Sequence, residues 1–322
     1  MPVLSKGCRQ CYKGAKLVLF VTGKCHRRCW YCPISDERKD KDVVFANDRQ
    51  VFCDEDLLKE AHLMSALGTG VTGGEPFMVS ERVAHYCTIL KKEFGQEHHI
   101  HLYTGIAPGE ELLRRYQGLI DEIRLHPPQE TWENILESPY IASADTARRL
   151  GFECTIEVPS LPGLEKLIPA LPHLDHLNIN ELEWSATNAE AMRDRDLDLE
   201  DNYHNAVLGA ERWATEILTH EKVHWCSSAF KDSVQLRERL KRIAGNTARP
   251  FDEITDDGTI VYGVLEPEGP LPDLEPESYE DKGDHIEMAW WILLDEALNL
   301  PGKKYVIERY PNEGMIVELT PL

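Results

Sequence analysis

The sequence lacks any apolar run long enough to cross a membrane. No stretch approaches the roughly 18 consecutive apolar residues that a spanning helix needs. The first residues, MPVLSKGCRQ, also lack the apolar segment of a secretory signal peptide. We therefore expect a cytoplasmic protein with no membrane partner.

Basic residues are scarce. The chain has 35 Lys and Arg against 56 Asp and Glu, which gives a formal net charge of -21. Non-specific binding to nucleic acid needs a surplus of cationic side chains, so the overall charge opposes it. A local cluster at Arg237, Arg239, Lys241 and Arg242 could still contact an anionic substrate or simply form a solvated helix face. Nucleic acid therefore stays open as a partner.

The sequence also lacks the signs of a disulfide framework. It has nine cysteines, an odd number, and no export signal. Disulfide-stabilised proteins are mostly secreted and pair their cysteines. Metal binding or redox chemistry is therefore the better explanation for this many thiols.

Strand-like and helix-like segments alternate along most of the chain. Short β-branched or apolar runs predict strands at 16–22, 70–75, 99–103, 122–125, 153–158, 176–179 and 222–225. Helical patterns lie between them, including Leu164–Leu171 and Ala206–Thr219. Repeated strand–helix units predict an α/β fold with a parallel sheet, either doubly wound or closed into a barrel.

The composition changes near residue 246. A segment rich in Pro, Asp, Glu and Gly follows, with a predicted helix at Asp284–Leu298 and short strands at 304–309 and 315–319. We expect three parts: a Cys-x2-Cys segment at 1–13, the main domain at 14–245 and a small α+β domain at 246–322.

A cysteine-rich loop follows the first predicted strand. Cys25, Cys29 and Cys32 have the spacing C-x3-C-x2-C. Three thiolates on one short loop can bind three irons of a [4Fe–4S] cubane and leave the fourth iron open. Zinc usually takes four protein ligands in two pairs, which this loop does not supply. The loop therefore favours an iron–sulfur cluster with one open coordination site.

This loop resembles the signature of the radical S-adenosylmethionine (SAM) superfamily, with Tyr31 before the last cysteine and Pro33 after it. The resemblance implies a partial (βα)6 TIM-type barrel. It also implies that the open iron chelates SAM, that one electron cleaves SAM to a 5′-deoxyadenosyl radical, and that Tyr31 lies at the cofactor.

A second motif supports the resemblance. Thr72-Gly73-Gly74-Glu75-Pro76 ends the second predicted strand. Glycines allow close approach of a ligand, and a carboxylate can accept hydrogen bonds from an amine. In the superfamily the matching motif holds the amino group of SAM, so the resemblance makes Gly73, Gly74 and Glu75 cofactor contacts.

Later strands end in further polar residues. The resemblance makes Tyr103 and Thr104 candidates for a ribose contact, and places Glu157 in the region that contacts adenine. Asn178 and Asn180 end the sixth predicted strand. Barrel enzymes build their sites at the carboxyl ends of strands, so these side chains are expected on one face as cofactor contacts. Alternatively, they cap the loops that follow.

Within the superfamily, residues 16–185 resemble an archaeal group related to pyruvate formate-lyase activating enzymes. The segments in which this resemblance lies are Cys25–Ser35, Thr72–Pro76, Asp121–Pro127, Glu157–Gly163 and Asn178–Glu183. The relation is one of architecture, and no residue pattern assigns a glycyl-radical partner.

A second metal site is a further hypothesis. Cys8 and Cys11 form a C-x2-C pair, a spacing that suits zinc or a second iron–sulfur cluster. Cys226 and His224 are the candidates for the remaining ligands. Against this set, the first pair precedes a strand and Cys226 ends one, so they could lie at opposite ends of the sheet. Cys226 could instead face the substrate as a hydrogen-atom donor, or be a buried structural thiol.

The sequence thus predicts a radical SAM enzyme that abstracts hydrogen from an unidentified substrate: RNA, a peptide or a small metabolite. It would need a one-electron reductant such as ferredoxin or flavodoxin. The alternative is a non-enzymatic iron–sulfur or zinc-binding protein, which would leave Gly73, Gly74 and Glu75 unexplained.

Overall fold

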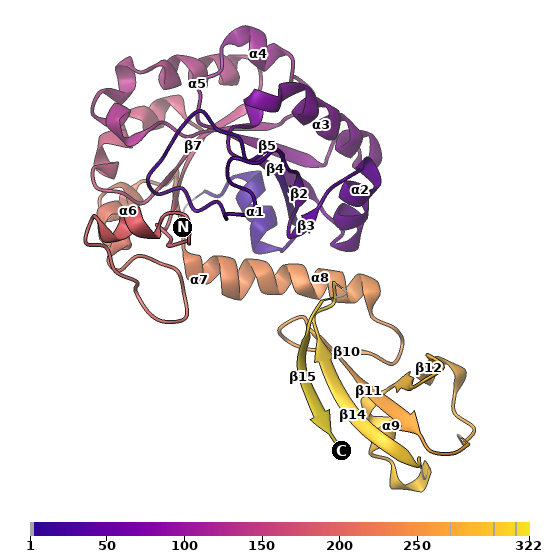
Figure 1. Cartoon of the computed structure of the whole chain (residues 1–322). Coiled ribbons are helices and arrows are strands. Elements are labelled where there is room, and N and C mark those ends of the chain that lie inside the picture. Colours follow the sequence, from indigo (N-terminus) through magenta and orange to yellow (C-terminus); the bar gives the residue numbers. More distant parts are fainter. Residues whose placement is uncertain (1–2, 271, 299, 313) are drawn as a thin grey trace. The chain divides into compact units, whose positions relative to one another are not determined.

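A computed structural model describes residues 3–270, 272–298, 300–312 and 314–322. These form two compact units (Figure 1). The first contains the described residues up to His62 together with Ala66–Val234, and the second contains Leu63–Ser65 with Gln235–Leu322. The division falls ahead of the expected boundary at residue 245, and the Cys-x2-Cys segment belongs to the first unit.

The first unit is built on one sheet with the order β3-β2-β1-β4-β5-β6-β7-β8-β9. Its strands are β1 (Lys16–Phe20), β2 (Phe45–Ala46), β3 (Arg49–Gln50), β4 (Gly68–Thr72), β5 (His99–Thr104), β6 (Glu122–Leu125), β7 (Glu153–Pro159), β8 (His176–Asn180) and β9 (Val223–Cys226). The sheet is parallel from β1 through β4 to β9, and β2 and β3 form an antiparallel hairpin beside β1. This curved parallel sheet confirms the partial barrel.

The barrel is wider than the resemblance implied. Seven of the nine strands in this sheet run parallel, where a six-stranded barrel was expected. The extra strand is β9, which the sequence predicts as a strand and which pairs with β8 from Leu177 and Val223 onward.

The α-helices of the first unit are α1 (Lys6–Tyr12), α2 (Asp54–Leu63), α3 (Ser80–Phe94), α4 (Glu110–Arg114), α5 (Pro139–Arg149), α6 (Ala189–Arg193) and α7 (Ser228–Phe230). Helices α2 to α5 cover the outer side of this sheet, whereas α1 lies on its inner side (Figure 1). Outward positions of the strands are apolar and fully buried, for example Leu17 and Leu19 on β1 and Ile156 on β7. Because side chains alternate along a strand, the apolar core lies between the sheet and the helices.

The inner side of the sheet is polar near its floor. Lys16, His99, His101, Glu122 and Arg124 are all buried there on neighbouring strands. Helix α1 packs against β1, β4 and β5 and lies against these side chains. The barrel floor is therefore a buried polar network closed by the N-terminal helix.

Two predicted helices of the first unit are not α-helical. Leu164–His173 is a 3-10 helix that contains Pro169 and Pro172, whose missing N–H groups prevent a regular α-helix. The segment predicted as a helix at 206–219 holds short 3-10 helices at Ala210–Ala214 and Ile217–Thr219. Its first residues are bonded across the chain instead, since Val207 N donates to Leu182 O.

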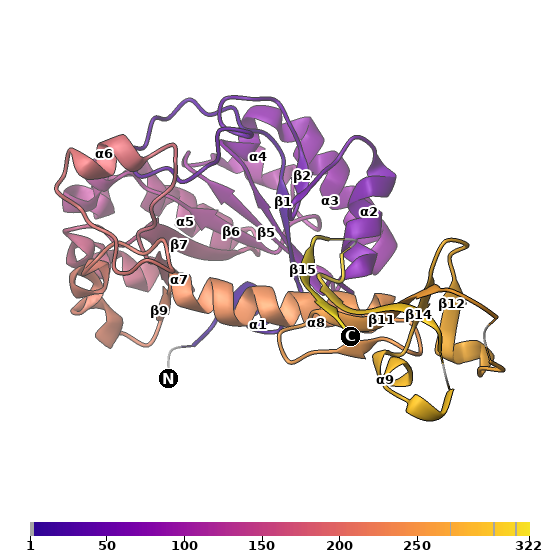
Figure 2. The same ribbon diagram turned by 60° about the horizontal axis from the view of Figure 1, so that its bottom comes forward.

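The second unit is an antiparallel sheet with the order β12-β13-β11-β14-β15, to which β10 adds by pairing with β11. Its elements are α8 (Arg237–Thr247), β10 (Glu253–Ile254), β11 (Ile260–Pro267), β12 (Tyr279–Asp281), β13 (Ile286–Met288), α9 (Trp290–Leu293), β14 (Gly302–Arg309) and β15 (Ile316–Pro321). Helix α9 packs beside β11 (Figure 2).

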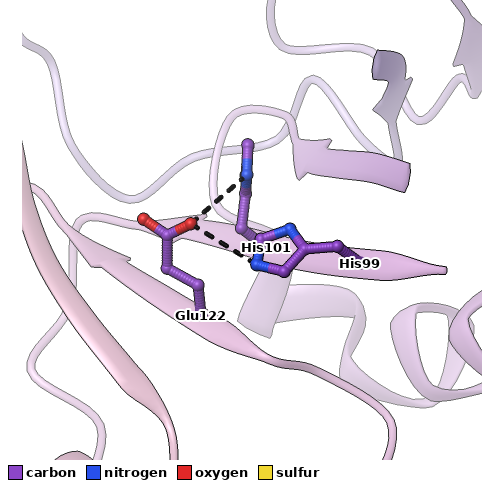
Figure 3. Close-up of side chains that lie close together, drawn as sticks. All are labelled: His99, His101 and Glu122. Carbon is purple, nitrogen blue, oxygen red and sulfur yellow. Dashed lines mark ion pairs between the residues drawn. The ribbon is translucent and has the colours of Figure 1, made fainter. Parts of the chain in front are cut away.

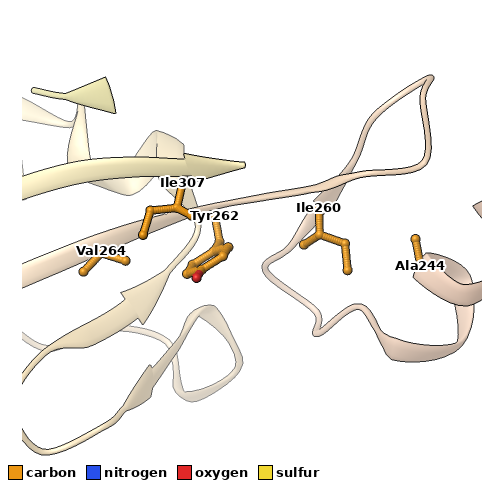
Figure 4. Close-up of a cluster of buried hydrophobic side chains, with 5 residues drawn as sticks. All are labelled: Ala244, Ile260, Tyr262, Val264 and Ile307. Carbon is orange, nitrogen blue, oxygen red and sulfur yellow. The ribbon is translucent and has the colours of Figure 1, made fainter. Parts of the chain in front are cut away.

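Two apolar clusters stabilise this unit. One joins Ala244 of α8 to Ile260, Tyr262, Val264 and Ile307 of β11 and β14 (Figure 4). This contact explains why the unit begins before α8 and not after it. The other cluster includes Leu265, Met288 and Leu293. The predicted helix at 284–298 is wrong, because its first residues form β13 and only a short α9 follows.

In the described residues, no helix combines the length and apolar character that crossing a membrane requires.

Candidate active site at the carboxyl ends of the strands

The cysteine loop leaves the carboxyl end of β1. Cys25, Cys29 and Cys32 are each partly exposed and carry free thiols. The turn is tight, since Cys32 N donates to Cys29 O at 3.1 Å and Arg27 N donates to Cys25 Sγ at 3.3 Å. Burial raises the pKa of the Cys25 and Cys32 thiols. A raised pKa means that burial disfavours the charged thiolates. A bound metal ion would replace the protons and compensate the thiolate charges.

The Gly-Gly-Glu segment is bonded directly to the start of the cysteine loop. Gly74 N donates to Thr22 O at 2.6 Å, and Glu75 N donates to Lys24 O at 2.9 Å. A Cβ on Gly73 would lie 2.6 Å from Thr22 O, and one on Gly74 would lie 2.3 Å from Lys24 O. In this structure the glycines are required by the backbone of the cysteine loop, where the sequence suggested ligand approach.

Glu75 is buried and almost fully engaged. Its carboxylate accepts hydrogen bonds from Phe77 N at 3.1 Å, Thr104 Oγ1 at 2.8 Å and Gly105 N at 2.8 Å. A carboxylate has about four acceptor positions, so about one remains for a ligand. The three protein donors fix the orientation of that remaining position beside the cysteine loop.

Tyr31 connects the cysteine loop to the end of β6. Its hydroxyl lies 2.8 Å from Nε2 of His126, and Nδ1 of His126 lies 2.8 Å from the carbonyl oxygen of Glu157. Because a carbonyl only accepts, Nδ1 carries the proton and Nε2 accepts from Tyr31. Burial lowers the pKa of His126 and raises that of Tyr31, so both groups are neutral.

Glu157 lies at the centre of a second group. Its carboxylate accepts from Arg124 Nη1 at 2.6 Å, Asn178 Nδ2 at 3.0 Å and Asn180 Nδ2 at 2.8 Å. Arg124 also donates to the hydroxyl of Tyr103 at 3.2 Å. Burial would raise the pKa of Glu157, but the Arg124 charge and the two amide donors outweigh it and hold that pKa below its usual range.

The predicted cofactor contacts therefore fall into two groups. Gly73, Gly74, Glu75 and Thr104 surround the start of the cysteine loop, whereas Tyr103, Glu157, Asn178 and Asn180 surround Arg124. Tyr31 touches the second group through His126.

Three residues of the site were not predicted from the sequence. Arg124 holds Glu157, and His126 positions Tyr31. Arg27 lies next to Glu75 and donates to the Tyr140 hydroxyl and to His126 O at 3.4 Å. A signal existed for two of them, since Arg124 and His126 lie on and directly after a short strand-like segment.

The opposite side of the cysteine loop is held by the segment directly before α6. Asn188 is buried and donates to Tyr31 O at 3.1 Å. Thr187 donates to Ile34 O at 2.6 Å and to Cys32 O at 3.3 Å. The loop is thus fixed from both sides, which is the preorganisation that a cluster site needs.

The cysteines proposed for a second metal lie closer together than expected. Cys8 Sγ accepts from Asn178 Nδ2 at 3.4 Å, and the ring of Tyr12 lies 6.1 Å from that of His224. His224 is the register partner of Asn178, and Cys226 is that of Asn180. Among the described residues, however, Cys8, Cys11, Cys226 and His224 are not a set whose ligand atoms all lie within 4.8 Å of one another. The four-ligand site stays a prediction.

Cys226 ends β9 at the same edge as the other strand-end residues. Burial raises the pKa of its thiol to about 12, although the charge of Lys231 acts in the opposite direction. A thiol with this pKa keeps its hydrogen at neutral pH. Lys231 itself is paired with Glu183 at 2.7 Å.

The residues fit an iron–sulfur cluster and SAM. One loop supplies three thiols, and sulfur ligands suit iron–sulfur clusters. The neighbouring Glu75 keeps about one acceptor position for an amine.

Comparisons with known proteins agree with this geometry. Residues 8–125 match the family described as 4Fe-4S single cluster domain, and residues 258–322 match a domain of unknown function. A protein of Methanocaldococcus jannaschii named "Putative glycyl-radical enzyme activating enzyme MJ0021" is 38% identical over 277 residues, which covers 81% of this chain and 73% of that protein.

Solved structures of SuiB from Streptococcus suis are more distant. SuiB bound to S-adenosylmethionine has 12% identity and a TM-score of 0.44, covering 66% of this chain. SuiB alone has 12% identity and a TM-score of 0.45, covering 75% of this chain. The chain spans about half of SuiB, namely 50% and 54% of those two chains.

The cluster loop, the strand-end site and the parallel barrel thus define a radical SAM enzyme, and the resemblance seen in the sequence is confirmed. Within that superfamily, the chain belongs to the family of the M. jannaschii protein. Its cofactors are a [4Fe–4S] cluster and SAM. The non-enzymatic alternative is set aside.

Proposed function

We propose that this enzyme abstracts a hydrogen atom from a polypeptide, using SAM bound to a cluster held by Cys25, Cys29 and Cys32. One observation carries the proposal. The cysteine loop and the Gly-Gly-Glu segment are joined by backbone hydrogen bonds at Gly74 and Glu75, which fixes the Glu75 carboxylate beside the cluster loop.

Different side chains contact different parts of the cofactors. When bound, the cluster supplies one electron to SAM. Glu75 accepts from the SAM amino group, and Thr104 and Gly105 keep the Glu75 carboxylate in place. The group around Glu157, whose carboxylate accepts from Asn178 and Asn180, would supply the polar contacts for the nucleoside. Tyr31 and His126, both neutral, connect the cysteine loop to the backbone of Glu157 by hydrogen bonds.

Two considerations support a polypeptide substrate. The M. jannaschii relative carries the name of an activating enzyme for glycyl-radical enzymes, which are proteins. The net charge of -21 opposes RNA. In the basic helix α8, Arg237 lies 3.5 Å and Lys241 lies 3.6 Å from the Glu238 carboxylate, which reduces the positive charge of this helix.

Two further roles complete the proposal. Cys226, a protonated thiol at the end of β9, donates a hydrogen atom to the substrate radical, and the thiyl radical that this leaves returns to the thiol by taking one electron from the reductant and one proton. The electron comes from a one-electron protein reductant of the ferredoxin or flavodoxin kind.

The test is 5′-deoxyadenosine formation by anaerobically reconstituted full-length protein with dithionite and SAM. Wild type is expected to release 5′-deoxyadenosine. Cys29→Ala is expected to form at least about 1000-fold less of it, because one ligand of the cluster is gone. Cys53→Ala is the matched control, since Cys53 is an exposed free thiol outside the site.

Wild-type protein that holds iron and sulfide in full yet matches the Cys29→Ala yield would contradict the proposal. Adding candidate peptides, small metabolites or RNA then separates substrate classes. Stimulation by RNA or a metabolite, but not by any peptide, would contradict the polypeptide assignment while leaving SAM cleavage intact.

A further inference from the structure

Two histidines and one glutamate converge in the barrel floor, away from the carboxyl ends of the strands. His99 and His101 lie on β5, and Glu122 lies on β6. His99 Nε2 is 3.8 Å and His101 Nδ1 is 3.7 Å from the same oxygen, Oε2 of Glu122 (Figure 3). The three ligand atoms of this group lie within 4.8 Å of one another. All three side chains are almost completely buried, with at most 3% exposure.

The two imidazole nitrogens that face Glu122 have no hydrogen-bond partner. His99 Nε2 and His101 Nδ1 are both buried and unpaired, and the distance of each to Glu122 is too long for a hydrogen bond. A buried polar atom without a partner costs about 1–3 kcal/mol. Two such atoms that face one carboxylate oxygen therefore point to a missing group between them.

The carboxylate is already oriented by other donors. Oε1 of Glu122 accepts from Arg124 Nε at 2.9 Å and Thr155 Oγ1 at 2.7 Å, and Oε2 accepts from Arg124 Nη2 at 3.1 Å. Such outer hydrogen bonds are typical of carboxylates that ligate metals. They fix Oε2 in the position that faces both histidines.

The chain leaves space for the His101 ring from two sides. A Cβ on Gly7 of α1 would lie 2.5 Å from His101 Nδ1, and a Cβ on Gly70 of β4 would lie 2.6 Å from His101 Nε2. Both positions are therefore restricted to glycine by this ring. The imidazole is held in one place, as a ligand should be.

Two cationic side chains border the group, and neither excludes a cation. Arg124 is paired with Glu157 at 2.6 Å as well as with Glu122. Lys16 Nζ lies 3.1 Å from His99 Nδ1, 3.2 Å from His99 O and 3.3 Å from Gln10 Oε1. Lys16 therefore contacts Nδ1 of His99, whereas Nε2 of the same ring is directed at Glu122.

We propose that His99 Nε2, His101 Nδ1 and Glu122 Oε2 bind one divalent first-row transition cation, with Zn²⁺ the best match, in the barrel floor. Two imidazoles and one carboxylate are an established ligand set for such ions. Ligands around tetrahedral zinc lie roughly 3.3 Å apart at metal–ligand distances of about 2.0–2.1 Å. The distances from the two nitrogens to Glu122 Oε2, 3.8 and 3.7 Å, are close to this spacing, and all three ligand atoms lie within 4.8 Å of one another.

The three proposed ligands belong neither to the cysteine loop nor to the group around Glu157, although Arg124 contacts both Glu122 and Glu157. The site also differs from the predicted cysteine site, because its donors are nitrogen and oxygen. Its ligands join β5 to β6 directly beneath α1, so the ion stabilises the barrel floor.

The test uses full-length protein with its cluster reconstituted, incubated with Zn²⁺ and then dialysed. Elemental analysis is expected to give about one zinc per chain. Zinc X-ray absorption is expected to show nitrogen and oxygen neighbours at about 2.0–2.1 Å with imidazole scattering and no sulfur. His101→Gln and Glu122→Gln are expected to lower zinc affinity by more than about 100-fold.

His98→Gln is the matched control, because His98 is equally buried beside β5 but bonds Thr69 at 2.9 Å. It should keep its zinc, as should the Cys8→Ser/Cys11→Ser double variant. Three results would overturn the proposal: no zinc above background in wild type, a sulfur neighbour at about 2.3 Å, or undiminished zinc in both ligand variants. The wild-type measurements decide the question even if a variant fails to fold.

Discussion

At the scale of single residues, the buried guanidinium of Arg124 connects the two polar groups of the barrel. It pairs with Glu122 at 2.9 Å and with Glu157 at 2.6 Å, and all three side chains are buried. Removing one partner of a buried ion pair leaves a charge without compensation. The cysteines and Glu75 could be predicted from local motifs, whereas the partners of Arg124 are distant in sequence and no motif marks them.

Arg124→Met is expected to lower the free energy of unfolding by about 3–5 kcal/mol at pH 7, measured by urea denaturation. In wild type, the lowered pKa of Glu157 contributes stability above about pH 4.5 that is lost as the pH falls through the folded-state pKa. In the variant, burial raises the pKa of Glu157, so acid neutralises an unpaired carboxylate.

The difference between Arg124→Met and wild type should therefore shrink from pH 7 to pH 5. A difference that is constant or larger at pH 5 would show that Glu157 is not the group left unpaired. Arg149→Met, at an exposed position paired with Glu110, is the control and should change stability little at either pH.

Glu75→Gln is expected to weaken SAM binding by about tenfold or more, because a charged acceptor is replaced by an amide that turns a donor towards Thr104 or Gly105. The measurement is the KM for SAM in the 5′-deoxyadenosine assay, with iron content as the control. An unchanged KM with a full cluster would remove Glu75 from the SAM site.

At the scale of elements, strands were predicted better than helices. Each parallel strand is a short apolar or alternating run, so its pattern is local. The helices predicted at 206–219 and 284–298 failed because those segments bond to distant parts of the chain, Val207 to Leu182 and Ile286 to Leu265. Likewise, the role of the Gly73–Gly74 pair depends on a neighbouring backbone that the sequence cannot place.

Gly74→Ala tests that contact between elements. The added Cβ would lie 2.3 Å from Lys24 O, which must move and disturb the cysteine loop. We expect a loss of about 1–3 kcal/mol in stability and a reduced iron content after reconstitution.

Gly245→Ala is the matched control for this substitution. Gly245 lies within α8 with nothing within 4 Å of an added Cβ. The free energy of unfolding of this variant should rise by about 0.5–1 kcal/mol, and its iron content should not change. Equal behaviour of the two variants would mean that the close approach at Gly74 does not hold the loop.

At the scale of the whole molecule, the acidic composition predicts that RNA is not a partner. With a net charge of -21, the chain is expected to give no shift of single-stranded or structured RNA at 50 mM or 200 mM salt in an electrophoretic assay. A shift that weakens steeply between those concentrations would reveal a cationic RNA surface and would redirect the search for substrate.

The central claim is that the three-cysteine loop holds a cluster whose open iron binds SAM. The most direct measurement is electron paramagnetic resonance of the dithionite-reduced, reconstituted protein, recorded with and without SAM. We predict a reduced [4Fe–4S] signal whose g values shift on adding SAM. A signal that SAM leaves unchanged, in protein with a full complement of iron and sulfide, would contradict the account.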